Sequence, residues 1–193
     1  MIPVEECMSN FLLKHLNRNA RSRRGKPEEI LKILNVAKGE SVADIGAGGG
    51  YFTLEFARRV GPKGKVYAVD IRLKTLDFIR NQAVKAGQAN VVPVLVRSDD
   101  FLLPDGGIDL VFLRNVYHHL DRPVSYFQKL RPHLRKSGRV AVIDYKKGMN
   151  WISLLGHSVN REQLIQNMKM AGYRMVRSYD ILRAQSFHVF QAE

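Results

Sequence analysis

A shortage of cysteine, of long apolar runs and of acidic residues sets the first limits on this 193-residue chain. Cys7 is the only cysteine, so no disulfide can form within the chain, which fits a reducing compartment. No apolar run approaches the roughly 20 residues that cross a bilayer, and Glu5 and Glu6 stand where a signal peptide would carry basic residues. The sequence therefore predicts a cytoplasmic globular protein without a membrane span or a signal peptide.

The deficit of acidic residues leaves a strongly basic chain. Lysine and arginine number 31 against 18 Asp and Glu, a formal net charge of +13. Such an excess attracts phosphate, RNA or anionic lipid, so nucleic acid is a possible partner on charge alone. The densest basic run, between Lys14 and Lys26, lacks the interleaved aromatic residues that would stack on bases. A small-molecule acceptor is nevertheless the favoured partner, no metal site is predicted, and the oligomeric state is left open.

The pattern of apolar residues predicts one α/β domain over 27–193, preceded by a basic N-terminal extension over 1–26 that can act as a lid. Runs rich in β-branched residues alternate with helical ones, and this order predicts a parallel sheet. Two further runs near the C-terminus leave no room for a helix between them, so we expect them to pair antiparallel. The expected strands are 41–45, 65–70, 91–96, 108–113, 139–144, 173–182 and 186–191. Gly138 is expected to turn the chain into the fifth strand, and Asn160 with Gln163 resembles a capping box that begins the last helix.

A glycine-rich turn follows the first expected strand. Gly46, Gly48 and Gly50 are spaced G-x-G-x-G, and glycine at such a turn allows positive φ and close approach of the backbone to a ligand. The dinucleotide fingerprint would require a small residue at position 51, where this chain has Tyr51. We expect the three glycines and Tyr51 to lie at the binding site of a nucleoside cofactor.

Acidic residues at the ends of the first two expected strands identify the type of cofactor. Asp44 would repel a pyrophosphate but attract the ammonium of S-adenosylmethionine; the alternative is that it only ties down the loop. Asp70 follows Gly50 by 20 residues, the distance at which such folds place a carboxylate on ribose hydroxyls. Ile71 is expected to pack on adenine, although a core position is the alternative.

The third expected strand is followed by a second acidic pair. Asp99, with Asp100 in reserve, can accept a hydrogen bond from the adenine amine, or can cap the following turn. The cofactor expected from all these acids is S-adenosyl-L-methionine, with S-adenosylhomocysteine as product.

These segments together resemble the class I methyltransferases of the ubiquinone/menaquinone-biosynthesis type, also described as methyltransferase type 11-like. The likeness covers roughly 25–193 and rests on the segments 42–53, 64–71, 99–104 and 109–120. It implies a Rossmann-like, mostly parallel seven-stranded sheet with an antiparallel C-terminal hairpin and helices on both faces. It also implies that Asp70 binds ribose, Asp99 binds adenine, and the turn from Asp44 to Gly50 holds the methionine portion.

The resemblance names a cofactor but no methyl acceptor. The segment after the fourth strand reads Arg-Asn-Val-Tyr over 114–117, where relatives that methylate planar amino groups have Asn-Pro-Pro-Tyr, which disfavours N6-adenine and glutamine-amide methylation. The lone Cys7 excludes pyrimidine C5 and arsenite methylation, which need a nucleophilic cysteine or several thiols. A small or medium acceptor, methylated at O, C or N, is expected. RNA or a ribosomal protein is the alternative acceptor, and a non-catalytic cofactor-binding module is a third possibility.

The residues after the fourth and fifth expected strands form the expected wall of the acceptor pocket. Arg114 is assigned to the cofactor set and to this wall, and Tyr117, His118 and His119 are the candidate catalytic residues. A histidine can take the proton of a hydroxyl acceptor, whereas hydrogen bonding at a helix end is its structural alternative. Asp144 and Tyr145 are secondary candidates, and the connection over 146–156, with Trp151, is a possible lid.

Overall fold

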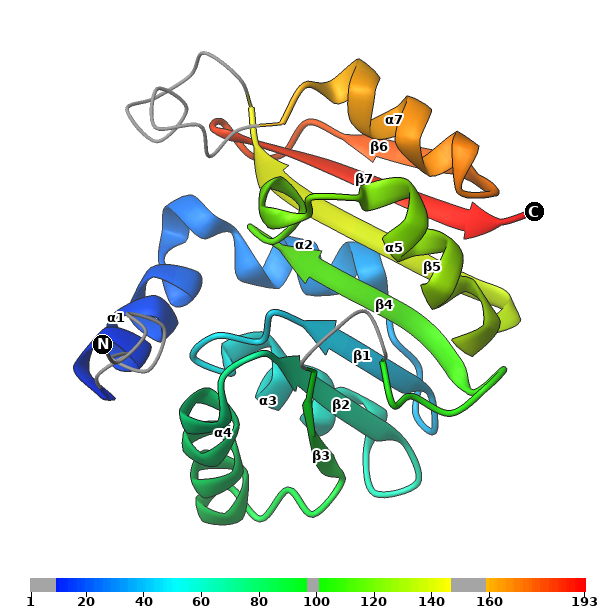
Figure 1. Cartoon of the computed structure of the whole chain (residues 1–193). Coiled ribbons are helices and arrows are strands. Elements are labelled where there is room, and N and C mark those ends of the chain that lie inside the picture. The colour runs from blue at the N-terminus through cyan, green and yellow to red at the C-terminus, as the bar shows by residue number, and fades with distance from the viewer. Residues whose placement is uncertain (1–9, 97–100, 147–158) are drawn as a thin grey trace, which may run out of the picture. The chain divides into compact units, whose positions relative to one another are not determined.

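A computed structural model describes residues 10–96, 101–146 and 159–193 (Figure 1). The chain divides into two compact units, Met1–Leu102 and Leu103–Glu193. Within the described residues, no helix is long and apolar enough to span a bilayer.

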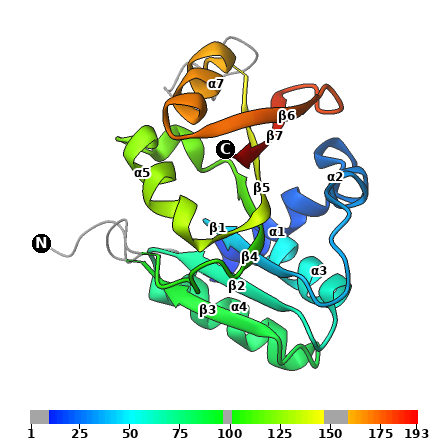
Figure 2. The same ribbon diagram turned by 90° about the vertical axis from the view of Figure 1, so that its right-hand side faces the viewer.

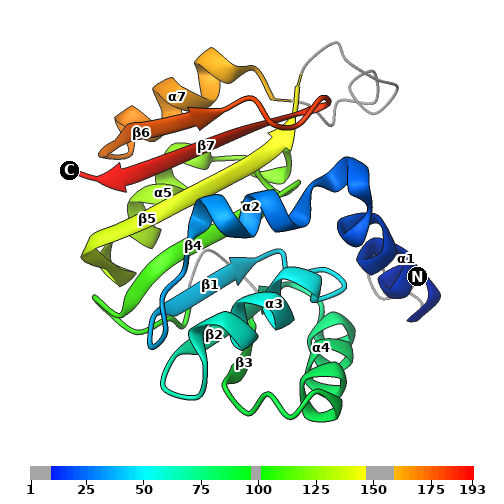
Figure 3. The ribbon, with the colours of Figure 1, turned by 180° about the vertical axis from the view of Figure 1, so that it is seen from behind.

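The first unit contains three parallel strands in the order β3-β2-β1. Helix α3 packs on β1 and β2, and α4 packs on β2 and β3 (Figures 1 and 3). The strands are β1 (Ser41–Ile45), β2 (Lys65–Asp70) and β3 (Val91–Leu95), and the helices are α1 (Asn10–Arg21), η2 (Arg23–Gly25), α2 (Pro27–Leu34), α3 (Tyr51–Val60) and α4 (Leu73–Lys85). The register pairs Asp44 with Ala68 and Asp70 with Leu95, so the strands end at one common edge.

The second unit contains four strands in the order β4-β5-β7-β6. β4 and β5 are parallel, whereas β7 is antiparallel to both β5 and β6. Helices α5 and α7 contact each other and lie on the same face of these strands (Figures 1 and 2). The strands are β4 (Ile108–Arg114), β5 (Leu134–Tyr145), β6 (Tyr173–Tyr179) and β7 (Gln185–Ala192), and the helices are η3 (Tyr117–His119), α5 (Pro123–Leu130), η4 (Arg131–His133) and α7 (Arg161–Met170).

The helices form where the sequence has an apolar stripe and a suitable start. Pro27 begins α2, because its fixed φ suits the first turn and its missing N–H has no intrahelical partner there. Ile30, Leu31 and Leu34 recur at helical spacing and are at most 1% exposed. Burying each of them contributes roughly 1.5–3 kcal/mol, and this burial holds α2 in place.

The ends of the expected strands are found within three residues of their predicted positions, with one larger difference. β5 begins at Leu134 instead of 139, and Gly138 lies inside it. The register with β4 shifts here, since Ile108 pairs with Leu134 but Leu110 pairs with Arg139. A Cβ on Gly138 would lie 2.9 Å from the carbonyl oxygen of Ile108, so glycine permits a close approach at this bulge rather than a turn.

The expected start of the last helix is confirmed in one half of its pattern. Asn160 caps α7, because its side-chain oxygen accepts from the backbone N–H of Gln163 at 3.1 Å. The side chain of Gln163 donates to Asn167 at 2.9 Å instead of returning to Asn160. The reciprocal bond of a capping box is therefore replaced by an i,i+4 contact.

Candidate active site

The glycine turn of the first unit joins β1 to α3 and has the backbone conformation expected from its composition. Gly46, Gly48 and Gly50 have φ values of 66°, 53° and 80°. The N–H of Gly46 donates to the carbonyl of Val69 at 2.8 Å, and that of Gly50 donates to the carbonyl of Ala47 at 2.9 Å. A Cβ on Gly50 would lie 2.7 Å from Cγ1 of Ile79, so this position excludes side chains on steric grounds as well.

Helix α1 packs directly against this turn. Oδ1 of Asn17 accepts from the backbone N–H of Tyr51 at 3.0 Å, so a side chain 34 positions away caps the N-terminus of α3. A Cβ on Gly49 would lie 2.5 Å from the carbonyl oxygen of Leu13, which makes this glycine necessary for the contact. The Arg21 guanidinium carbon lies 5.4 Å from the centroid of the Tyr51 ring, in cation–π range.

Asp44 is buried at the end of β1, with 4% of its surface exposed. The Thr53 hydroxyl, in the first turn of α3, donates to Oδ2 of Asp44 at 2.6 Å. Burial raises the pKa of Asp44 to about 7; the Thr53 hydrogen bond opposes this change, and the nearby charge of Asp70 adds to it. Asp44 is therefore held by Thr53 through both its hydroxyl and its backbone N–H, so the carboxylate ties down the first turn of α3.

Asp70 ends β2 and is 3% exposed. Its Oδ2 accepts from the Gly48 N–H at 3.3 Å, and its Oδ1 accepts from both the backbone N–H and Nε of Arg72 at 3.0 Å. Ile71 is 64% exposed, which provides an apolar surface next to the carboxylate and excludes a core position. Asp99 and Asp100, the expected adenine partners, lie outside the described residues, as do Trp151 and most of the expected lid over 146–156.

A polar network at the end of β4 lies in the second unit. Nη2 of Arg114 donates to Oε1 of Gln185 at 3.1 Å, and Nε2 of Gln185 donates to Oδ1 of Asn115. Asn115 has a φ of 58°, a conformation that asparagine tolerates better than most residues. The first residue of β7 thus fixes the planar cation of Arg114.

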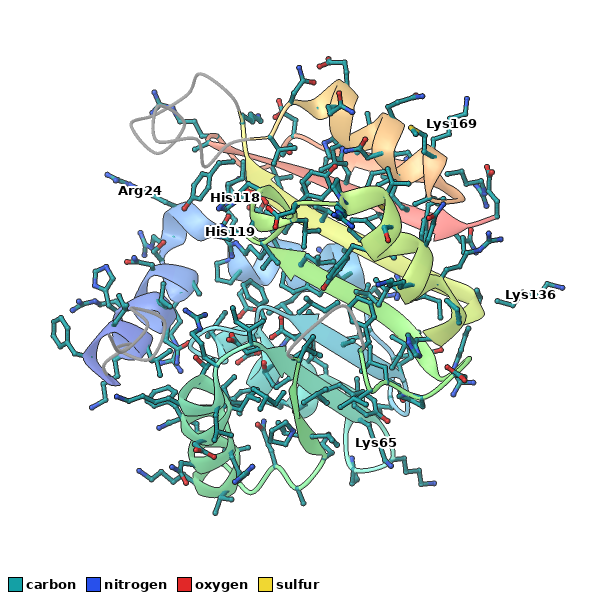
Figure 4. All side chains as sticks on the ribbon, viewed as in Figure 1. Arg24, Lys65, His118, His119, Lys136 and Lys169 are labelled. Carbon is teal, nitrogen blue, oxygen red and sulfur yellow. The ribbon has the colours of Figure 1, made fainter. Side chains whose placement is uncertain are left out.

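His118 and Asp144 meet at the ends of β4 and β5. Nδ1 of His118 lies 2.7 Å from Oδ1 of Asp144, and the two side chains are 5% and 0% exposed. Oδ2 of Asp144 accepts from the backbone N–H of His118 at 3.2 Å. The centroids of the His118 and His119 rings lie 3.9 Å apart, with the planes tilted by 48°, and both residues lie in the short turn after β4 (Figure 4).

His119 and Tyr117, the other two candidates, have different surroundings. His119 is exposed, whereas Tyr117 is 6% exposed and its ring stacks on Phe127 with centroids 6.1 Å apart. The Tyr117 hydroxyl accepts from Nδ2 of Asn167 at 2.8 Å. Burial raises the pKa of Tyr117, with the Asn167 bond acting in the opposite direction. These contacts favour a packing role for Tyr117.

Four partners of the candidate residues were not predicted from the sequence: Asn17, Thr53, Arg72 and Gln185. Thr53 had a usable signal, since the first turn of a helix after a glycine turn lies close to the end of the preceding strand. Asn17 and Gln185 had none, because their contacts span 34 and about 70 positions. Among the described residues, no three His, Cys, Asp or Glu side chains gather as a metal site would require.

The model of one protein family, described as "Methyltransferase domain", matches residues 37–184 of this chain. The matched span runs from the residues before β1 to the connection before β7, and it includes the glycine turn, Asp44, Asp70, His118 and Asp144. The chain belongs to the methyltransferase domain family. The cofactor that this membership implies is S-adenosylmethionine, so the expected family and cofactor are confirmed.

Curated relatives of this methyltransferase domain are named ubiquinone/menaquinone biosynthesis C-methyltransferase UbiE. The protein from Hahella chejuensis is 32% identical over 116 residues, which cover 60% of this chain and 47% of the relative. The protein from Stutzerimonas stutzeri is 32% identical over 125 residues, with 62% and 47% covered. The chain spans about half the length of the curated relatives it matches.

Solved structures share the fold of this methyltransferase domain. A SAM-dependent methyltransferase from Aquifex aeolicus has a TM-score of 0.85 at 22% identity, covering 96% of this chain and all of that one. A putative type 11 methyltransferase from Sulfolobus solfataricus has a TM-score of 0.69 at 20% identity, with 86% and 92% covered. The expected Rossmann-like fold, mostly parallel with antiparallel C-terminal strands, is thereby confirmed.

Proposed function

We propose that the chain transfers the methyl group of S-adenosylmethionine to a small or medium-sized acceptor. The observation that carries this proposal is the buried carboxylate pair, Asp44 and Asp70, beside the glycine turn. The charge of Asp70 adds to the rise that burial causes in the pKa of Asp44, so the two carboxylates repel each other. A cationic, phosphate-free nucleoside relieves that repulsion, whereas a pyrophosphate would increase it.

The residues of the first unit fit such a cofactor. Asp70 accepts the ribose hydroxyls, Ile71 covers adenine, and Asp44 with the glycine turn faces the ammonium end. Asp99 and Asp100 remain proposed adenine partners. When bound, S-adenosylmethionine supplies an electrophilic methyl group, so the protein mainly has to orient the acceptor and exclude water.

The acceptor side of the proposal rests on Arg114, His118 and His119, whereas Tyr117 packs on Phe127. Arg114 presents a guanidinium already oriented by Gln185, and of the three candidate catalytic residues we favour His118 because it is buried against a carboxylate. The relatives' names refer to C-methylation in ubiquinone and menaquinone biosynthesis, which agrees with a small molecule. We further propose that the protein acts in the cytoplasm.

RNA or a ribosomal protein remains the second candidate acceptor, motivated by the charge of +13. Figure 4 shows basic side chains that project outward from both units, among them Arg24 and Lys65 in the first and Lys136 and Lys169 in the second. A charge spread in this way does not distinguish a binding surface from general solvation. The small-molecule acceptor therefore stays the leading proposal.

Isothermal titration with S-adenosylmethionine tests the cofactor part of the proposal. We expect micromolar binding by the wild type and wild-type affinity in Asp77→Asn, a matched change at an exposed carboxylate on α4. The Asp70→Asn variant should lose most of the affinity. Absence of binding by the wild type would refute the proposal.

Incubation with labelled S-adenosylmethionine tests the acceptor class. A cell extract is separated into metabolite, RNA and protein fractions before the enzyme is added. We expect the label in the metabolite fraction. Label that enters only RNA or protein would favour the second candidate, and label in none would favour a non-catalytic binding module.

A further inference from the structure

The His118–Asp144 pair lies at the common edge of two parallel strands, β4 and β5, and is almost fully buried. A buried carboxylate is stable only when its oxygens are hydrogen-bonded, and an imidazole held by one has a defined orientation. We infer that Asp144 positions His118 as the general base for an acceptor that carries an ionisable hydroxyl, a phenol or an enol. This inference rests on the proposed methyl transfer and names its acceptor class.

Three donors fix the carboxylate of Asp144. Oδ1 receives Nδ1 of His118 at 2.7 Å and the backbone N–H of Tyr145 at 2.8 Å, while Oδ2 receives the backbone N–H of His118 at 3.2 Å. Both the backbone and the ring of His118 are thus tied to one side chain. The ring cannot rotate about its side-chain bonds without breaking the shorter contact.

This contact also selects the tautomer of His118. An ionised carboxylate only accepts hydrogen bonds, so the proton of the neutral imidazole lies on Nδ1 and the lone pair lies on Nε2. When Nε2 takes up a proton, the carboxylate 2.7 Å from Nδ1 stabilises the imidazolium that forms. Asp144 therefore contributes both the orientation and the charge that a base needs.

The hydroxyl class follows from what a base adds to methyl transfer. A neutral amine is already nucleophilic, and a thiol with a pKa near 8.5 ionises appreciably by itself, whereas a phenol with a pKa near 10 is mostly protonated near pH 7. The hydroxyl proton moves to Nε2 of His118, and the electron pair freed on the acceptor forms the bond to the methyl carbon. The carbon–sulfur bond breaks with its electron pair left on sulfur, which gives S-adenosylhomocysteine, and the imidazolium later releases the proton to water.

A spectroscopic test does not depend on turnover. Long-range 1H–15N spectra of histidine-labelled protein at pH 8.5, with His118 assigned from the His118→Gln variant, report which ring nitrogen carries the proton. We expect the Nδ1–H form in the wild type and a mixture of both tautomers in Asp144→Asn. The chain offers a matched control in Asp105→Asn, because Oδ1 of Asp105 also contacts a histidine, Nδ1 of His133, at 3.0 Å. His133 comes immediately before the first residue of β5, whereas Asp144 lies near the last residue of that strand. An Nε2–H form of His118 in the wild type would overturn the inference.

Turnover is measured with methyl-labelled S-adenosylmethionine and four probes: catechol, hydroquinone, aniline and thiophenol. Label should enter the two phenols, and Asp144→Asn should lower kcat by about 10²–10⁴-fold with unchanged cofactor affinity, since a positioned base contributes that much. The double variant with His118→Gln should be no slower than either single variant, because the two residues act as one unit. Asp105→Asn should retain wild-type kcat.

The outcomes separate this inference from the proposed function. Failure of the wild type to bind S-adenosylmethionine would refute methyl transfer itself. Cofactor binding combined with label only in aniline or thiophenol, or in no probe, would refute the hydroxyl class. A normal kcat in a folded Asp144→Asn variant would show that the carboxylate only ties the turn after β4 to β5.

Discussion

Replacing Asp44 by asparagine should make the protein more stable at neutral pH and hardly change it at acidic pH. The folded protein releases the Asp44 proton at about pH 7, whereas the unfolded chain releases it near the ordinary pKa of 3.8. Between these values folding binds a proton, so the free energy of unfolding falls as the pH rises. Asparagine keeps the shape and an oxygen for the Thr53 hydroxyl but has no charge to bury.

The magnitude follows from the difference in pKa. A rise of about 3 units at about 1.36 kcal/mol per unit corresponds to about 4 kcal/mol at pH 8, of which about 3 kcal/mol develops between pH 5 and pH 8. Urea unfolding of wild type and Asp44→Asn at several pH values within this range measures the difference directly. Asp77→Asn, at an exposed carboxylate, should show no such trend. A wild-type-to-variant difference that stays constant from pH 5 to pH 8 would refute the reasoning.

The same carboxylate should couple cofactor binding to pH. A cationic ligand stabilises ionised Asp44, so binding at pH 6 should release up to one proton, and the affinity should rise until about pH 7. Calorimetry in two buffers of different ionisation enthalpy counts the protons released. In Asp44→Asn the release should disappear and the affinity should fall. Equal affinity with no proton release in the wild type would show that Asp44 does not face the ligand.

Three further predictions concern other buried groups. Asp70→Asn should weaken S-adenosylmethionine binding by at least tenfold in titration calorimetry, because one charge-assisted hydrogen bond contributes about 1.5–3 kcal/mol; unchanged affinity would exclude Asp70 from the site. Gly50→Ala should lower the free energy of unfolding by about 1–3 kcal/mol more than Gly87→Ala in urea titrations, since both glycines have positive φ but only at Gly50 would the new Cβ meet a side chain; equal losses would show that Gly50 has room. His188 is 2% exposed, and its burial lowers its pKa to about 4. On acidification the unfolded chain therefore binds the His188 proton before the folded protein does, and the free energy of unfolding falls from pH 6.5 to pH 4. Urea unfolding should show no such loss in His188→Leu, and a loss that persists in this variant would point to another group.

The opposite signs at Asp44 and His188 have a consequence for the wild type. Between about pH 4 and 6.5, ionisation of Asp44 in the unfolded chain lowers stability as the pH rises, while loss of the His188 proton raises it. The two trends offset each other in the wild-type protein. Single variants are therefore required to see either one.

Much of the fold was predictable because its signals are local. Strand positions followed from β-branched runs, and the glycine turn with Asp44 and Asp70 followed from spacing within about 30 residues. The start of β5 was missed because a glycine such as Gly138 is compatible with either a turn or a β-bulge. Only the pairing of β5 with β4 shows that Gly138 lies at a bulge. A single sequence carries no record of that pairing.

The candidate site was predictable residue by residue but not as a set of contacts. His118 and Asp144 were each named from their places after a strand, yet their 2.7 Å contact depends on the register of β4 and β5. Arg72 was not named because its contact with Asp70 is set by a side-chain conformation rather than by a motif. Local spacing identifies the strand ends, whereas tertiary packing decides which side chains meet there.

The contact between Asn17 and the start of α3 also bears on how this chain can change over evolution. A Cβ at position 49 would clash with Oδ1 of Asn17, the atom that also accepts from the N–H of Tyr51, and would lie 2.5 Å from the carbonyl oxygen of Leu13. The side chain of Asn17 is thus one of the groups that require glycine at 49, and glycine at 49 is what lets Asn17 reach the start of α3. Positions 17 and 49 should therefore vary together among orthologues, and chimaeras that exchange the first helix between distant relatives should recover stability only when the turn is exchanged with it.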